Sequence, residues 1–127
     1  DVRGAVVGVR EISLAGELAS ARQALTAAGI TPRLPTAVDA VDPGLKELFA
    51  WTVRESVTNV VRHSGASTCR IDLEPKRIVV RDDGRGAHGG AQGSGLRGLR
   101  ERARLVGASV TTSSADENGF EVVVAGK

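Results

Sequence analysis

Two strand-like segments separated by a two-residue turn constrain the fold of this chain most strongly. Residues 68–74 (TCRIDLE) alternate apolar and polar side chains, as a strand with one buried face does, and residues 77–82 (RIVVRD) predict a second strand. Only Pro75 and Lys76 separate them, so the two segments predict a β-hairpin. Residues 108–114 and 119–125 predict a second hairpin, joined by the turn Asp116–Gly119. Two hairpins predict a sheet that is mainly antiparallel.

Three segments have helical signals. Residues 12–28 carry leucine and alanine at helical spacing, and Gly29 is a helix-ending residue. Asp42 followed by Pro43 is typical of a helix start, and predicts a long helix over roughly residues 43–63. A third helix is expected at about 96–106, ending at Gly107.

The remaining segments complete the expected order of elements. Residues 30–35 predict a short edge strand, because Pro32 and Pro35 cannot donate to a sheet ladder. With helices between the strands, we expect an α/β two-layer sandwich, a mixed and mainly antiparallel sheet with helices on one face. Residues 1–11 are expected to hold the tail of a preceding helix, and residues 12–127 one domain.

Composition excludes several classes of protein. The single cysteine, Cys69, leaves no internal disulfide and no cysteine-rich zinc site. The net charge is +2 and the only aromatics are Phe49, Trp51 and Phe120, so we expect no nucleic-acid partner. No apolar run approaches the about 18 residues that span a bilayer. We expect a cytoplasmic location, and the sequence leaves open whether a larger parent protein is anchored in the cell membrane.

The long helix carries polar residues beside its apolar stripe. Glu55, Asn59 and His63 are spaced four apart and form one row at the margin of that stripe. A carboxylate and a carboxamide one turn apart can hold a hydrated Mg²⁺. The simpler interpretation is an exposed glutamate, a capped asparagine and a surface histidine. The buried stripe itself is expected to consist of Leu45, Phe49, Thr52, Val53, Ser56 and Val60.

The segment RDDGRG (81–86) ends the second strand of the first hairpin. Asp82 is an acidic acceptor at a strand end and could take a hydrogen bond from an exocyclic amine such as that of adenine. Gly84 and Gly86 allow close approach of the backbone and positive φ. An ordinary Asp-Gly turn would have the same sequence, so the motif alone is weak.

Half of residues 84–95 are glycine, and this stretch leads into the third helix through GSGLRGLRER (93–102). Free amides at a helix N-terminus bind phosphates. The G-x-G-x-x-G spacing is not a dinucleotide fingerprint, because no β-strand directly precedes it and Asp116 lies in a turn. A P-loop is excluded because the chain has no Gly-Lys-Ser or Gly-Lys-Thr.

Together, ESVTNVVRHSGA, RDDGRG and GSGLRGLRERA, in this order and at these distances, resemble the N box and two glycine boxes of the histidine-kinase ATP-binding domain. The wider superfamily includes gyrase, a heat-shock chaperone and MutL, and implies a Bergerat-type ATP-binding fold. The N box and the short lid at 87–92 look like the nitrate-sensor and lipid-sensor branch. LAGELASARQALTAAGI also fits that branch, so the resemblance covers nearly everything beyond residue 11.

The resemblance implies a role for each matching residue. Asn59 would bind Mg²⁺, and Glu55 would orient a metal-bound water or act as the catalytic base. Asp82 would accept a hydrogen bond from the amine of adenine. Gly84 and Gly86 would shape the adenine pocket. Arg62 and His63 would lie near the phosphates, and the phosphate side would be built by the second glycine box: Gly93, Gly95, Leu96, Arg97 and Gly98. The implied partners are the phosphoacceptor (dimerisation) domain of a homodimeric kinase and a downstream response regulator.

Two departures from the family pattern stand out. The family usually has Gly-Thr at the start of the last strand, where this chain has Gly119-Phe120. Neither histidine, His63 or His88, has the context of a phosphoacceptor, so we expect these 127 residues to bind ATP without phosphorylating themselves. Three alternatives remain at this point: an anti-sigma-factor serine kinase, an ATP-driven clamp and a non-catalytic nucleotide-sensing module.

Overall fold

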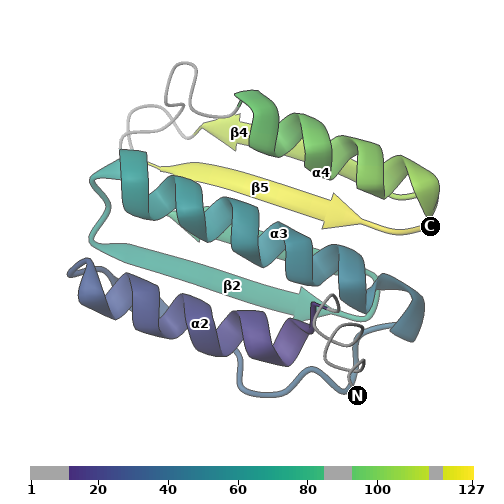
Figure 1. Cartoon of the computed structure of the whole chain (residues 1–127), viewed down its shortest axis with the longest axis horizontal. Coiled ribbons are helices and arrows are strands. Elements are labelled where there is room, and N and C mark those ends of the chain that lie inside the picture. Colours follow the sequence, from purple (N-terminus) through teal and green to yellow (C-terminus); the bar gives the residue numbers. More distant parts are fainter. Residues whose placement is uncertain (1–11, 85–92, 115–118) are drawn as a thin grey trace, which may run out of the picture.

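The computed structural model describes residues 12–84, 93–114 and 119–127. Within these ranges three α-helices cover one face of a five-stranded sheet (Figure 1). The helices are α2 (Leu14–Ala27), α3 (Lys46–Asn59) and α4 (Gly93–Leu105). The strands are β1 (Thr31–Arg33), β2 (Thr68–Glu74), β3 (Arg77–Asp82), β4 (Ser109–Ser114) and β5 (Phe120–Ala125).

The sheet has the strand order β1-β2-β3-β5-β4. Strand β1 pairs with β2 in parallel, and the other three pairings are antiparallel. The predicted mixed, mainly antiparallel α/β sandwich is therefore confirmed. The last strand, β5, lies between β3 and β4, and its register sets Phe120 opposite Asp82.

The core lies between the helices and the inner face of the sheet. On α2 the buried positions are those that the helical spacing predicts, Leu14, Leu18, Ala21 and Leu25. The six residues of the expected α3 stripe are all buried as well. Each large apolar side chain buried in this way stabilises the fold by about 1.5–3 kcal/mol. The inner face of the sheet contributes Ile71, Ile78, Val80, Val122 and Val124.

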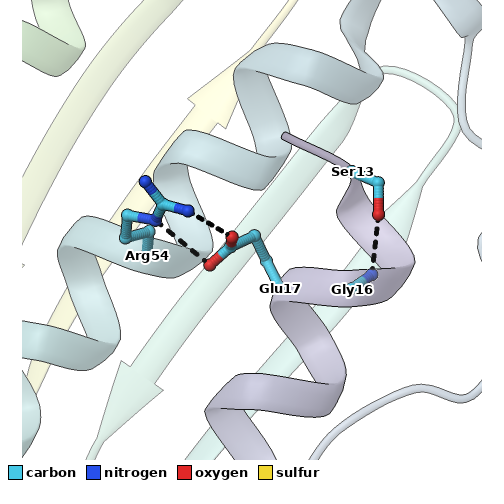
Figure 2. Close-up of polar contacts among 4 residues, drawn as sticks. All are labelled: Ser13, Gly16, Glu17 and Arg54. Atoms are coloured by element: carbon cyan, nitrogen blue, oxygen red, sulfur yellow. Dashed lines mark hydrogen bonds and ion pairs between the residues drawn. The ribbon is translucent and has the colours of Figure 1, made fainter. Parts of the chain in front are cut away.

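Helix α2 is capped at its start and tied to α3. The Oγ of Ser13 accepts a hydrogen bond of 2.9 Å from the backbone N–H of Gly16 (Figure 2). One turn further, Arg54 of α3 donates two hydrogen bonds to the carboxylate of Glu17, at 3.3 and 2.7 Å. This pair fixes the two helices side by side at their solvent-facing edge.

The predicted helix over residues 43–63 forms with irregular ends. It opens with a 3₁₀ turn, η1 (Pro43–Leu45), capped by Asp42, whose Oδ1 accepts from Gly44 N at 2.9 Å. It closes with a π-helical turn, η2 (Val60–Ser64), and the chain leaves it at Gly65 with a φ of 65°. Turns of the π type are often found at functional sites.

Helix α4 begins at Gly93, three residues before the predicted start at 96. The buried residues Leu96, Leu99 and Ala103 pack this helix onto the core, and this packing outweighs the low helix propensity of its glycines. Three sequence predictions fall outside the described residues: the helix tail at 1–11, the lid at 87–92 and the turn at 116–118. No described helix is long and apolar enough to cross a membrane.

Candidate functional site

A narrow pocket lies between α3 and the ends of β3 and β5. Its walls are mainly apolar, and polar groups enter it from α3 and from the end of β3. The β3–β5 register lines up Val80 with Val122 and Asp82 with Phe120, so neighbouring strands supply one wall. The lining residues are Ser56, Asn59, Val60, Val80, Asp82, Phe120 and Val122. Its free volume is about 10 Å³, which is room for about one water molecule.

Asp82 is held rigidly at the base of this pocket. It is the last residue of β3 and only 4% exposed. Its Oδ1 accepts a 2.8 Å hydrogen bond from the backbone N–H of Gly84. The sequence predicts Asp82 as an acceptor at a strand end, and the structure buries it beside α3.

Glycines fix the backbone around Asp82. The carbonyl of Gly84 accepts a 2.8 Å hydrogen bond from the N–H of Gly119, which precedes β5. Gly119 has a φ of 111°, and a Cβ on it would lie 2.7 Å from the backbone oxygen of Asp82. Any side chain at Gly119 would therefore push on the strand end that carries Asp82.

The neighbouring carboxylate, Asp83, has a different task. It accepts hydrogen bonds of 2.8–2.9 Å from the N–H and Oγ of Ser67 and from the N–H of Thr68. Burial alone would raise the pKa of Asp83, but these hydrogen bonds outweigh it and the pKa is lowered. Asp83 thus anchors the connection from α3 to β2 against the end of β3.

Glu55 lies beside the start of α4. A Cβ on Gly95 would be 2.6 Å from Glu55 Oε1, so the carboxylate lies directly against the first turn of that helix. A negative charge is stabilised at a helix N-terminus. The two helices also meet through Trp51, because Arg102 of α4 stacks 3.8 Å from its ring centroid. The hollow between them is lined by Trp51, Glu55, Gly95, Gly98, Leu99 and Arg102.

The structure brings most of the predicted site residues to one end of the molecule. Asn59 is half-buried and lines the pocket with Asp82. Arg62 and His63 follow it in η2, where Arg62 is exposed and the side chain of His63 is not described. Gly93, Gly95 and Leu96 form the first turn of α4, and Arg97 and Gly98 follow in the second. Gly86 lies outside the described residues.

The residues on α3 fit a magnesium ion by their donor chemistry. Glu55 and Asn59 offer oxygen ligands one helical turn apart and are both half-buried. In the described part of the chain, no group of three or more His, Cys, Asp or Glu side chains gathers in one place. Mg²⁺ is usually held by one or two protein oxygens together with substrate phosphates and water.

Sequence reasoning missed two features of this region. The helical spacing predicts that Ser56 is buried, which is confirmed, but it does not predict that Ser56 also lines the pocket. The Trp51–Arg102 stack between α3 and α4 had no signal beyond the presence of a single tryptophan. A surface hollow along β1 and β2 contains none of the predicted site residues.

The fold and this pocket define an α/β sandwich like that of histidine kinases. The cytoplasmic segment of histidine kinase QseC has a TM-score of 0.65 and 28% identity, over 92% of this chain and 72% of that structure. The sensor histidine kinase YvfT of Bacillus subtilis (strain 168) is 35% identical over 130 residues, 97% of this chain and 34% of YvfT. DesK, a sensor histidine kinase of the same strain, is 33% identical over 137 residues, 98% of this chain and 36% of DesK.

The chain thus belongs to the sensor histidine kinase family. It spans about a third of the length of the curated relatives YvfT and DesK. No protein-family model matches it.

Proposed function

We propose that residues 12–127 form the ATP-binding catalytic domain of a sensor histidine kinase. The domain binds Mg-ATP and donates the γ-phosphoryl group to a histidine on a separate dimerisation domain. The observation that carries this proposal is the pocket that sets the buried Asp82 beside Asn59 of α3, while Glu55 of the same helix lies against the first turn of α4.

The base of ATP would enter between α3 and β5, where the pocket of about 10 Å³ has to widen to admit it. Asp82 accepts a hydrogen bond from the exocyclic amine of adenine. The hydrogen bond that Asp82 Oδ1 accepts from Gly84 N holds the carboxylate in place. Val80, Phe120 and Val122 cover the faces of the ring. Gly84, and Gly86 beyond it, allow the backbone to approach the base closely.

The triphosphate would extend toward the start of α4. The amides of Gly93, Gly95 and Leu96 in the first turn supply hydrogen-bond donors, and the helix dipole favours the negative charge. Gly98 keeps the next turn free of bulk, since no heavy atom lies within 4 Å of a Cβ built there. Arg97, with an exposed side chain, neutralises part of the phosphate charge.

Residues of α3 and η2 would act on the metal and the phosphates. Asn59 and Glu55 would hold the magnesium ion, directly or through water, and Arg62 and His63 would lie near the phosphates. The ion neutralises charge on the phosphoryl group during transfer. Glu55 either orients a water on the metal or takes the proton of the acceptor histidine.

The partners follow from the same proposal. The acceptor lies on the dimerisation domain of the same kinase, which is a homodimer, and the phosphoryl group passes on to a response regulator. The domain works in the cytoplasm and binds no nucleic acid. YvfT and DesK are about three times as long as the matched segment, which leaves room for such a domain.

Labelled ATP tests the transfer reaction. The 127-residue chain is incubated with Mg²⁺ and γ-labelled ATP, alone and with the dimerisation domain of its own kinase. We expect no label on the chain and acid-labile label on the added domain. Label on the isolated chain, or acid-stable label on a partner serine, would contradict the proposal.

A further inference from the structure

The hydroxyl of Ser56 is buried in the pocket without a hydrogen-bond partner among the described residues. The side chain is 3% exposed and lines the same pocket as Asp82 and Asn59. Thr52, one turn earlier on α3, differs, because its Oγ1 donates to the carbonyl of Leu48 at 2.9 Å. That local bond is the usual way in which a helix satisfies a buried hydroxyl.

An unsatisfied buried hydroxyl has a cost in the free protein. Buried polar groups are nearly always paired, and each exception needs an explanation. Alanine at position 56 would remove the unpaired group and suit the helix better. The second buried polar atom without a described partner, Trp51 Nε1, belongs to the α3–α4 contact and not to this pocket.

The polar groups of the pocket complement one edge of adenine. The exocyclic amine of adenine is a donor flanked by ring nitrogens that are acceptors. Asp82 is an acceptor, and a serine hydroxyl is a donor that can rotate toward its partner. Guanine carries a carbonyl oxygen in place of the amine, which an ionised Asp82 would repel.

We infer that Ser56 is a specificity-determining residue of the proposed nucleotide site. Its hydroxyl donates a hydrogen bond, directly or through one water, to a ring nitrogen of adenine. This nitrogen lies beside the exocyclic amine, which donates to Asp82. This inference rests on the proposed function. It explains why α3 carries a hydroxyl at a core position, since the bound base supplies an acceptor that the described residues do not.

The test compares Ser56→Ala with Thr58→Ala, an exposed threonine on the same helix. For each chain we measure the melting temperature without nucleotide and the calorimetric affinity for ADP with Mg²⁺. We expect Ser56→Ala to melt at or above the wild-type temperature and to bind ADP about five- to tenfold more weakly. Thr58→Ala should also melt at or above the wild-type temperature, because alanine favours the helix, but it should keep the wild-type ADP affinity.

Deaza analogues locate the contact without relying on the variant alone. Replacing the ring nitrogen that Ser56 contacts with carbon, in 1-deaza-ADP or 7-deaza-ADP, should weaken wild-type binding by a similar factor. Ser56→Ala should be insensitive to that same replacement. With the other analogue, Ser56→Ala should weaken binding by the same factor as it does with ADP.

Two results would overturn the inference. One is a lower melting temperature for Ser56→Ala with unchanged ADP affinity, which would make the hydroxyl a packing group. The other is an equal effect of Ser56→Ala on ADP and both analogues. A wild-type chain that binds no ADP would instead overturn the proposed function, so the two failures are distinguishable.

Discussion

Gly95 of α4 lies against Glu55 of α3 so closely that a Cβ there would be 2.6 Å from Oε1 of the carboxylate. Glycine at position 95 therefore leaves space for the carboxylate of Glu55, in addition to giving the backbone its usual flexibility. Glu55 ends in flexible bonds, so a methyl group at position 95 would displace the carboxylate and leave the helices in place. This relationship separates the position of Glu55 from the stability of the fold.

Gly95→Ala should impair phosphoryl transfer without destabilising the domain. Alanine favours helix by about 1 kcal/mol over glycine, so the melting temperature should stay level or rise. Displacing Glu55 should slow autophosphorylation of the whole kinase on the order of 100-fold, because small misplacements of a catalytic group are costly. The measurement is the initial rate with saturating Mg-ATP.

Arg104→Ala is the control for Gly95→Ala. Arg104 is exposed in the last turn of the same helix, away from the proposed phosphate site. This variant should keep nearly the wild-type rate. Wild-type transfer by Gly95→Ala would remove Glu55 from the proposed mechanism.

Local patterns in the sequence predict the elements well and their assembly less well. The spacing of Leu14, Leu18 and Leu25 predicts the buried face of α2. The strand-like segments 68–74 and 77–82, with the short turn between them, predict the hairpin with its bounds. The start of α4 differs because the packing of Leu96 and its neighbours is a tertiary effect. The place of β5 between β3 and β4 is likewise not a local property.

The candidate site, like the fold, is predicted in part by local sequence patterns. The spacing of Glu55 and Asn59 predicts a polar row at the margin of the stripe, and both are half-buried. The unpaired hydroxyl of Ser56 and the approach of Gly95 to Glu55 depend on neighbours from other elements. No one-dimensional pattern contains those distances.

Asp83→Asn should lower stability at neutral pH and remove part of the acid sensitivity. Because the folded pKa of Asp83 is lowered, its contribution is present above the unfolded pKa of about 3.9 and is lost as pH falls through the folded pKa. We expect a drop of a few degrees in melting temperature at pH 7, which shrinks below about pH 4.

Asp72→Asn serves as the control for Asp83→Asn. Asp72 is also exposed and pairs with Arg70 at 3.2 Å on the outer face of the sheet. Exposed pairs of this kind contribute little. If both variants melt alike at pH 7, the anchoring role of Asp83 is wrong.

Cys69 should resist alkylation in the folded chain. Burial, aided by the carboxylates of Asp82 and Asp83, raises the pKa of its thiol to about 12. At pH 8 the thiol is therefore neutral, and iodoacetamide should label it far more slowly than in denaturant. The raised pKa also means that stability declines as pH rises above about 8.5, where the unfolded thiol ionises. Equal labelling of folded and unfolded chains would contradict this.

The central claim is tested most directly by calorimetric titration of ATP, with and without Mg²⁺, into the wild type, Asp82→Asn and Asn59→Asp. We predict binding by the wild type and loss of binding by Asp82→Asn, because the amine of adenine loses its charged acceptor. Asn59→Asp should keep its Mg²⁺-free binding of the nucleotide, since the proposed role of the Asn59 carboxamide is to bind the metal and aspartate has nearly the same shape in the pocket wall. Equal binding by all three proteins, with and without Mg²⁺, would contradict the account.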